Sequence, residues 1–266
     1  MESPSTRPVA LVTGASSGIG LELAKQFAEH DFDLIVTAED EGIETAAQEL
    51  AASGVNAQAV RVDLAAERGV EELWSRVGTA GRPLDAAALN AGVGAGGAFV
   101  DNELADELRL IDLNVRSTVH LAKYVVRDMV TRDRGRLLLT SSIASTMPGA
   151  FQAVYNASKS FVQSFALALR NELKDTGVSV TSLMPGPTDT EFFERADMLD
   201  TKVGSGDKDD AAEVARQGFE ALMNGDERVV AGSLTNKLQA AGGRLMPDGA
   251  KAALHRRMAE PGSGQK

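Results

Sequence analysis

The 266-residue chain contains no cysteine, which excludes disulfide bonds, cysteine nucleophiles and thiolate metal sites. Its three histidines, His30, His120 and His255, are far apart in the sequence and form no cluster with the spacing of metal ligands. We therefore expect no metal site and no histidine-based triad. The absence of cysteine also fits a reducing compartment, and we expect a cytoplasmic protein.

Long apolar runs and positive charge are also scarce. No apolar run approaches the roughly 20 residues that a membrane-spanning helix needs. Residues 1–8 lack the apolar core of a signal peptide. Acidic residues outnumber basic ones by 38 to 27, and the resulting net charge of −11 disfavours binding to nucleic acid and to anionic membranes. We expect neither as a partner, and solubility is the simplest meaning of the charge.

The chain does contain a regular alternation of short apolar runs and helical stretches. Continuous apolar runs are typical of strands that are buried on both faces of a parallel sheet. The pattern predicts strands at 9–12, 34–36, 55–62, 86–90, 137–139, 178–184 and 228–231, and helices at 18–30, 102–131 and 154–174. We therefore predict an α/β fold: a single Rossmann-type domain with a doubly wound parallel sheet and helices on both faces.

No repeat or linker divides the chain, so we place this one domain at residues 9–258. Residues 1–8 and 259–266 are expected to be flexible N-terminal and C-terminal tails. Glycine and serine in the stretch 204–210 indicate a mobile loop.

A glycine-rich segment follows the first predicted strand and begins the first predicted helix. Gly14, Gly18 and Gly20 stand in the spacing G-x-x-x-G-x-G. Glycines permit a tight turn and a close approach of backbone amides to a pyrophosphate, and the helix N-terminus adds partial positive charge. Such turns also occur for packing alone, but the position at the first strand–helix junction favours a dinucleotide site.

The residues after the second predicted strand indicate which dinucleotide binds. Glu39 and Asp40 stand there, and no Arg or Lys occupies positions 37–42. A carboxylate accepts hydrogen bonds from a ribose 2′-hydroxyl and repels a 2′-phosphate, which usually meets an arginine. We therefore expect NAD as the cofactor, with NADP as the alternative. In a second interpretation these acidic residues only cap the next helix.

Tyr155 and Lys159 are four residues apart within a predicted helix, so their side chains share one face. A neighbouring ammonium favours phenolate and lowers the pKa of a tyrosine from its usual value of about 10. With the hydroxyl of Ser142 nearby, the pair forms a plausible acid/base device for an alcohol or a carbonyl. The adjacent Ser141 is an alternative hydroxyl, and a tyrosine can also be buried for packing alone.

With these motifs in order, the chain resembles the classical short-chain dehydrogenase/reductase family over roughly residues 9–230. The resemblance rests on these matching positions: the glycine segment 13–20, Asp63-Leu64, Asn90-Ala91-Gly92, Asn114, Ser142, Tyr155, Lys159 and Pro185-Gly186. It implies an NAD(P)-dependent oxidoreductase that interconverts a secondary alcohol and a ketone. The substrate would be a small molecule, and a homo-oligomer would be expected.

The resemblance also assigns roles to individual residues. The implied catalytic residues are Asn114, Ser142, Tyr155 and Lys159, with Asn114 holding a water that connects Lys159 to solvent. The implied cofactor-binding residues are Gly14, Ser16, Ser17, Gly18, Ile19, Gly20, Glu39, Asp63, Leu64, Asn90, Ala91, Gly92, Tyr155, Lys159, Pro185, Gly186 and Thr188. In this set, Asp63 would meet the adenine amino group and Thr188 the carboxamide of nicotinamide.

The resemblance places a substrate loop at about 188–210. Candidate pocket residues are Met147, Phe151, Phe192, Phe193 and Met198, which favour a hydrophobic substrate, although core packing explains them equally well. The segment 228–232 lacks the Asp-Gly-Gly ending of many tetrameric members, so a dimer is expected before a tetramer. Because fold does not fix function, a non-catalytic nucleotide sensor or scaffold is the alternative function.

Overall fold

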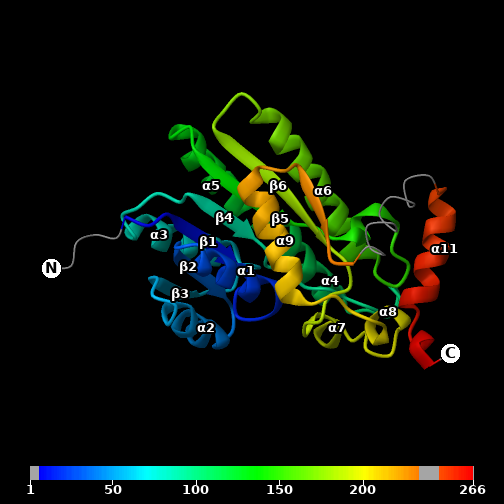
Figure 1. Ribbon diagram of the computed structural model, residues 1–266. Coiled ribbons are helices and arrows are strands. Elements are labelled where there is room, and N and C mark those ends of the chain that lie inside the picture. The colour runs from blue at the N-terminus through cyan, green and yellow to red at the C-terminus, as the bar shows by residue number, and fades with distance from the viewer. Residues whose placement is uncertain (1–5, 234–245, 266) are drawn as a thin grey trace.

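The computed structural model describes residues 6–233 and 246–265 of the chain. Within these residues, seven strands form one parallel sheet with the order β3-β2-β1-β4-β5-β6-β7 (Figure 1). The strands are β1 (Val9–Thr13), β2 (Asp33–Ala38), β3 (Ala57–Arg61), β4 (Ala86–Leu89), β5 (Gly135–Thr140), β6 (Val178–Pro185) and β7 (Arg228–Ala231). Each overlaps a predicted strand, and the predicted Rossmann-type fold is confirmed.

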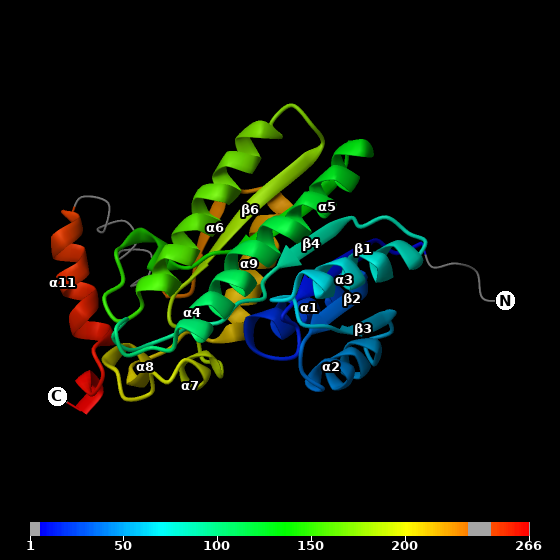
Figure 2. The same cartoon turned by 180° about the vertical axis from the view of Figure 1, so that it is seen from behind.

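Two layers of helices cover the sheet, because successive residues of each strand point to opposite faces. In β1, Ala10 and Val12 pack with α1 (Gly18–Glu29), α2 (Gly42–Ala51) and α9 (Ala211–Asn224), seen with the sheet in Figure 1. Val9 and Leu11 pack on the other face, with α3 (Glu67–Thr79), α5 (Thr118–Thr131) and α6 (Ala153–Glu172), seen from behind in Figure 2. The central strands are therefore buried on both faces, which explains their continuous apolar runs in the sequence, whereas the edge strand β3 has exposed residues.

The helix predicted at 102–131 forms, but it contains an irregular turn. It runs as α4 (Leu104–Ile111), a π-helical turn η1 (Asp112–Ser117) and α5. Asn114 lies in η1, and its side chain bonds to the loop after β4 instead of facing solvent. A π-turn inserts an extra residue into the helical ladder and is frequent at functional sites.

The chain after β6 builds a separate group of short elements at one end of the sheet. These are α7 (Phe192–Arg195), α8 (Lys202–Ser205), α11 (Asp248–Ala259) and the turn η3 (Ser263–Gln265). In both views α11 stands beside α8, at the opposite end of the molecule from β3. Phe193, Ala196, Met198 and Ala259 form a small core that joins α11 to the predicted substrate loop.

The structure describes residues 204–210, which we predicted to be a mobile loop, and parts of the two predicted flexible tails. In the stretch 204–210, Gly204 belongs to α8, and the amide of Asp209 donates to the carbonyl of Pro187 at 2.8 Å. Gly262 and Gly264, in the predicted C-terminal tail, donate amide hydrogen bonds to Asp200 at 2.7 and 2.9 Å. Residues 1–5 and Lys266, also predicted as tail, lie outside the described residues.

Over the ranges 6–233 and 246–265, the helices are too short or too polar for any of them to cross a membrane.

Candidate active site

One cavity of about 300 Å³ opens where the carboxyl ends of the parallel strands meet. Open α/β sheets bind ligands at such an edge, where neighbouring loops turn in opposite directions. The cavity is lined by every cofactor-binding residue predicted from the sequence and by Ser142, Tyr155 and Lys159. Asn114 is the exception, because it lies behind the cavity wall. The structure therefore brings together residues that span positions 14 to 188 of the chain.

The glycine segment forms the turn between β1 and α1. Gly14 has a φ of 66°, and a Cβ at this position would lie 3.0 Å from the Cα of Ala91. A side chain would therefore strain the turn and push the loop after β4 away. Ser17 precedes α1 but gives no side-chain hydrogen bond to its first turn, and that turn holds no acidic residue in the described chain. The N-terminus of α1 is thus left to an external anion, as in dinucleotide-binding folds.

The far edge of the cavity carries charge, and we call Glu39, Asp63 and Arg109 the charged edge. Arg109, in α4, bonds Glu39 Oε2 through Nη2 at 2.5 Å and Asp63 Oδ2 through Nη1 at 3.0 Å. The hydrogen bond that Arg109 donates to Asp63 outweighs partial desolvation and raises the pKa of Arg109 further above its already high value. All three side chains are between 41% and 54% exposed, so salt and solvent screen these pairs.

Asp40 has a different role from its neighbour Glu39. Its carboxylate accepts hydrogen bonds from the Ser16 hydroxyl at 2.8 Å and from the Gly42 amide at 2.9 Å. It therefore joins the glycine segment to the first turn of α2, in agreement with the helix-capping interpretation for this residue. Glu39 is left as the carboxylate whose side chain is not used to hold the backbone.

The middle of the cavity is held together by polar side chains at strand ends. The Thr13 hydroxyl accepts the amides of Asn90 and Ala91 at 2.9 and 3.0 Å. The Asn90 side chain accepts a hydrogen bond from the Thr140 hydroxyl at 3.1 Å and donates one to the Thr13 carbonyl at 3.3 Å. Three strand ends, β1, β4 and β5, are thereby fixed relative to one another.

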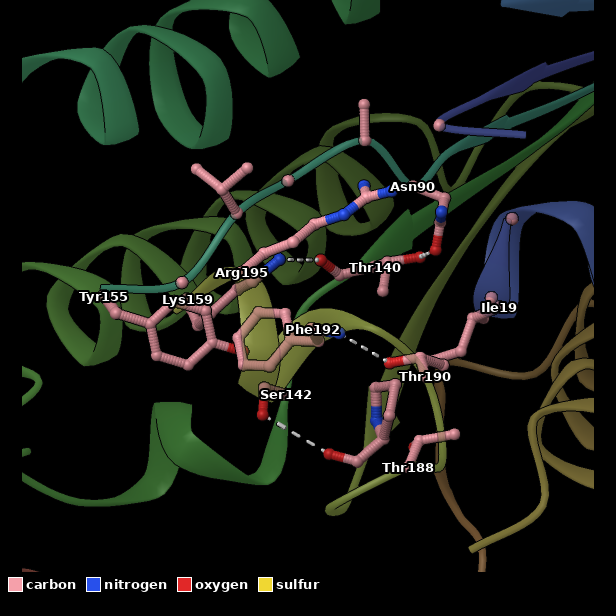
Figure 3. A pocket seen from close by; sticks show the side chains of 18 of the residues that line it. Ile19, Asn90, Thr140, Ser142, Tyr155, Lys159, Thr188, Thr190, Phe192 and Arg195 are labelled. Atoms are coloured by element: carbon pink, nitrogen blue, oxygen red, sulfur yellow. Dashed lines mark hydrogen bonds between the residues drawn. The ribbon is translucent and has the colours of Figure 1, made fainter. Parts of the chain in front are cut away.

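At the opposite end lie Ser142, Tyr155 and Lys159, which we call the tyrosine end (Figure 3). Lys159 Nζ donates to the Thr140 carbonyl at 3.1 Å and lies 5.9 Å from the centroid of the Tyr155 ring. Ser142 donates to the Pro185 carbonyl at 3.3 Å and bonds the phenol of Tyr155. Ser141 instead donates its hydroxyl to the Lys159 carbonyl at 2.9 Å. The geometry thus favours Ser142 over Ser141 as the hydroxyl that meets a substrate.

The acid–base properties of this end differ from our expectation. Burial raises the pKa of Tyr155 to about 12, and the hydrogen bond with Ser142 only partly opposes this effect. Burial also lowers the pKa of Lys159 to about 8. We predicted that Lys159 would lower the pKa of Tyr155. In this structure it does not, because Nζ faces the Thr140 carbonyl and desolvation of the phenol dominates.

Asn114 supports the tyrosine end from behind. Its Oδ1 accepts the amide of Val93 at 2.9 Å, and its Nδ2 donates to the carbonyl of Val93 at 2.9 Å and to the Ser158 hydroxyl at 3.1 Å. A Cβ on Gly92 would lie 3.0 Å from Asn114 Oδ1 and 3.2 Å from Lys159 Nζ. A glycine at 92 therefore lets the loop after β4 pass between these two side chains.

Apolar side chains surround the space next to Tyr155. Phe192 lies 5.3 Å from Tyr155 between ring centroids, and its ring lies close to the phenol in Figure 3. Further apolar lining comes from Ile143, Met147, Phe193, Val203 and Met258. Of the five predicted pocket residues, Met147, Phe192 and Phe193 line the cavity, whereas Phe151 and Met198 pack in the small core beside α11.

Some lining residues were not predicted from the sequence, most clearly His255 and Met258 in α11. His255 Nδ1 donates to the Ala150 carbonyl at 2.9 Å, and burial lowers the pKa of His255. No local motif marks these residues, because they reach the cavity only through the packing of α11 on the substrate loop. Arg109 was missed for the same reason: it is distant in sequence from both of its partners.

Comparison with known proteins agrees with the fold. The family model described as short chain dehydrogenase matches residues 8–199. The chain belongs to the short-chain dehydrogenase family. It is therefore an oxidoreductase that acts on CH–OH groups with NAD or NADP.

Individual relatives of this short-chain dehydrogenase have several activities. Sulfoacetaldehyde reductase 2 of Chromohalobacter salexigens is 33% identical over 186 residues, which cover 69% of this chain and 74% of the relative. The structure of a short-chain dehydrogenase from Sphingobium yanoikuyae in complex with NADPH has a TM-score of 0.80 and 27% identity, covering 93% of this chain and 94% of that one. A bulky-bulky ketone specific alcohol dehydrogenase from Comamonas testosteroni has a TM-score of 0.76 and 25% identity, covering 91% and 94%.

Proposed function

We propose that this short-chain dehydrogenase interconverts a hydrophobic secondary alcohol and its ketone, with Tyr155 as the acid/base, and that it prefers NAD. One observation carries the proposal: a single cavity joins the open N-terminus of α1 to the buried group of Ser142, Tyr155 and Lys159. A dinucleotide has its phosphates in the middle and its reactive ring at one end. The cavity offers an anion site and a proton-transfer site in that arrangement.

The residues present fit such a cofactor. The turn at Gly14 has no room for a side chain, and the uncapped helix N-terminus is suited to a pyrophosphate. Gly14, Gly18 and Ile19 would hold the phosphates and the nicotinamide half, Asp63 and Leu64 the adenine, and Thr188 the carboxamide. When bound, the nicotinamide ring supplies the hydride for reduction or accepts it in oxidation.

The proton at the substrate oxygen is handled by the protein. Ser142 hydrogen-bonds this oxygen and places it beside the phenol. During reduction Tyr155 donates its proton to the oxygen, and during oxidation it accepts the proton from the alcohol. For Lys159, charged below its pKa of about 8, to stabilise the phenolate that forms, its Nζ must turn from the Thr140 carbonyl toward the phenol oxygen. Burial keeps water away, which strengthens each of these interactions.

The substrate class follows from the cavity wall beside Tyr155. Ile143, Met147, Phe192 and Met258 offer apolar surface on several sides. Such surface favours a carbon-rich group. Gln152, Arg195 and His255 also line the cavity and could contact a polar group on the substrate. The likeness to an alcohol dehydrogenase named for bulky ketones supports the same class.

The preference for NAD rests on Glu39. This carboxylate lines the cavity beyond the glycine segment, where it can accept hydrogen bonds from a ribose diol. A 2′-phosphate at the same place would meet its negative charge. We expect a moderate preference, because Arg109 already neutralises part of that charge.

The proposal is tested by titrating the purified protein with NADH and with NADPH, following nicotinamide fluorescence, and then assaying NADH oxidation with bulky hydrophobic ketones. We expect both cofactors to bind, NADH more tightly by up to about tenfold, or ~1.4 kcal/mol. We also expect turnover with at least one ketone. Tighter binding of NADPH would overturn the cofactor preference alone. Binding of NADH without turnover of any ketone or alcohol would favour a nucleotide sensor, and binding of neither cofactor would refute the proposal.

A further inference from the structure

The charged edge contains the cation Arg109, although the sequence next to Glu39 contains no basic residue. Positions 37–42, which cover the end of β2 and the residues after it, hold no basic residue. The fold nevertheless brings two arginines to Glu39 from other elements. The strand register pairs Ala38 with Arg61 of β3, and α4 extends Arg109 over the same strand ends.

The two arginines are used differently. Arg61 donates to the backbone carbonyl of Glu39 at 3.2 Å and pairs with Glu41 at 3.1 Å, so it braces the strand end and a surface carboxylate. Both ion pairs of Arg109 go to carboxylates of the charged edge. Arg109 is therefore the cation that a ligand at Glu39 and Asp63 would meet first.

The short distance between Arg109 and Glu39 determines which ligand Arg109 could bind. With Arg109 Nη2 at 2.5 Å from Glu39 Oε2, an anion that took the place of this carboxylate would be within reach of the same guanidinium. The planar guanidinium matches a phosphate with two parallel hydrogen bonds. A ribose 2′-phosphate is such an anion, and Glu39 is the group that we assign to the ribose 2′-position.

We propose that Arg109 is a specificity-determining residue that weakens the discrimination of Glu39 against a 2′-phosphate and binds this phosphate when the Glu39 carboxylate is removed. Discrimination between NAD and NADP is then a property of the pair, set by a carboxylate on β2 and a guanidinium on α4. The inference rests on the proposed function, since it takes the charged edge to be the subsite for the adenosine ribose.

The test is a double-mutant cycle in which Kd for NADH and for NADPH is measured by fluorescence titration. Glu39→Gln is expected to tighten NADPH binding by about tenfold or more, the low end for a hydrogen bond to a charged group, and to weaken NADH binding, because a neutral amide accepts more weakly from the ribose diol. Arg109→Gln is expected to weaken NADPH binding severalfold more than NADH binding. In the double variant, most of the gain for NADPH is expected to disappear, because no guanidinium remains to bind the phosphate.

Arg116→Gln is the matched control. Arg116 lies seven residues further along the same continuous helix, is 52% exposed and also pairs with two carboxylates, Glu67 and Asp112. Neither carboxylate partner of Arg116 lines the cavity, whereas both partners of Arg109 do. Arg116→Gln therefore removes the same charge from the protein and is expected to leave both Kd values unchanged. An equal effect of Arg109→Gln and Arg116→Gln would mean that only net charge matters and would overturn the inference.

The outcomes separate the inference from the function on which it rests. If wild-type protein binds neither cofactor, the proposed function fails first. If both cofactors bind and Glu39→Gln gains the same affinity for NADPH with or without Arg109, the inference is wrong while the proposed function stands. Equal changes in the two Kd values on loss of Arg109 would contradict it in the same way.

Discussion

The two ends of the cavity are built by opposite means. At the tyrosine end, Ser142, Tyr155 and Lys159 are no more than 9% exposed and are held by hydrogen bonds within the protein. At the charged edge, Glu39, Asp63 and Arg109 are about half exposed and are held by ion pairs. The groups that we propose to move protons are fixed and desolvated, whereas the groups that we propose to contact the adenosine end of the cofactor remain open to water.

This difference determines how each end responds to change. Desolvation moves the pKa of Tyr155 up to about 12 and that of Lys159 down to about 8. A small change in burial at the tyrosine end therefore changes the protonation of these two groups. Exposed ion pairs contribute roughly 0–1 kcal/mol each to stability. The charged edge can therefore lose or gain a charge at little cost to the fold, and selectivity for the cofactor can change while the catalytic end stays intact.

The largest expected effect comes from Tyr155→Phe. Loss of the acid/base group is expected to lower kcat by about 10²–10⁴-fold, while Kd for NADH changes little because the ring remains packed. Steady-state kinetics and fluorescence titration measure the two quantities. Tyr124→Phe is the control, since Tyr124 is the other tyrosine of the chain and stacks on Trp74 at 5.4 Å. Full activity of Tyr155→Phe would break the assignment of the tyrosine end.

A smaller effect is expected when kcat/KM for ketone reduction is measured as a function of pH. Reduction needs a protonated Tyr155, whose pKa is about 12, and a charged Lys159, whose pKa is about 8. As pH rises through 8, Lys159 loses its proton, so kcat/KM is expected to be flat below pH 8 and to fall above it. His255 does not account for this fall, because burial moves its pKa below the usual value and places its titration on the acid side.

Lys159→Arg sharpens this prediction. A guanidinium stays charged throughout this range, so the variant is expected to be slower and to lack the fall above pH 8. Lys123→Arg, on the exposed side of α5, should keep the wild-type profile. An unchanged fall in Lys159→Arg would assign the titration to another group and contradict the role of Lys159.

Much of the fold and of the tyrosine end could be predicted from the sequence, because the patterns that indicate them lie in consecutive or closely spaced residues. Apolar runs show which strands are buried on two faces, and the strand ranges follow directly from them. The spacing of Gly14, Gly18 and Gly20 reflects a turn made by consecutive residues. Tyr155 and Lys159 share a helix face for the same reason, and the structure brings both to the cavity.

Other features could not be predicted, because they depend on approach between distant segments. Positions 37–42 contain no basic residue, whereas the arginines beside Glu39 come from other elements, Arg109 from α4 and Arg61 from β3. The pKa of Tyr155 follows burial, which spacing on a helix does not reveal. His255 and Met258 reach the cavity only because α11 packs against the substrate loop, and no periodicity in the sequence indicates that contact.

The most direct test of the proposed chemistry is a transfer experiment with NADH that carries two deuterium atoms at C4 and a bulky hydrophobic ketone that the enzyme turns over. The product is analysed by mass spectrometry and NMR, with wild type and Tyr155→Phe compared at saturating cofactor. We expect wild type to place one deuterium on the carbinol carbon of the alcohol, and Tyr155→Phe to form this product at a small fraction of the rate. An alcohol without deuterium at that carbon, or labelled product from Tyr155→Phe at the wild-type rate, would contradict hydride transfer with Tyr155 as the proton donor.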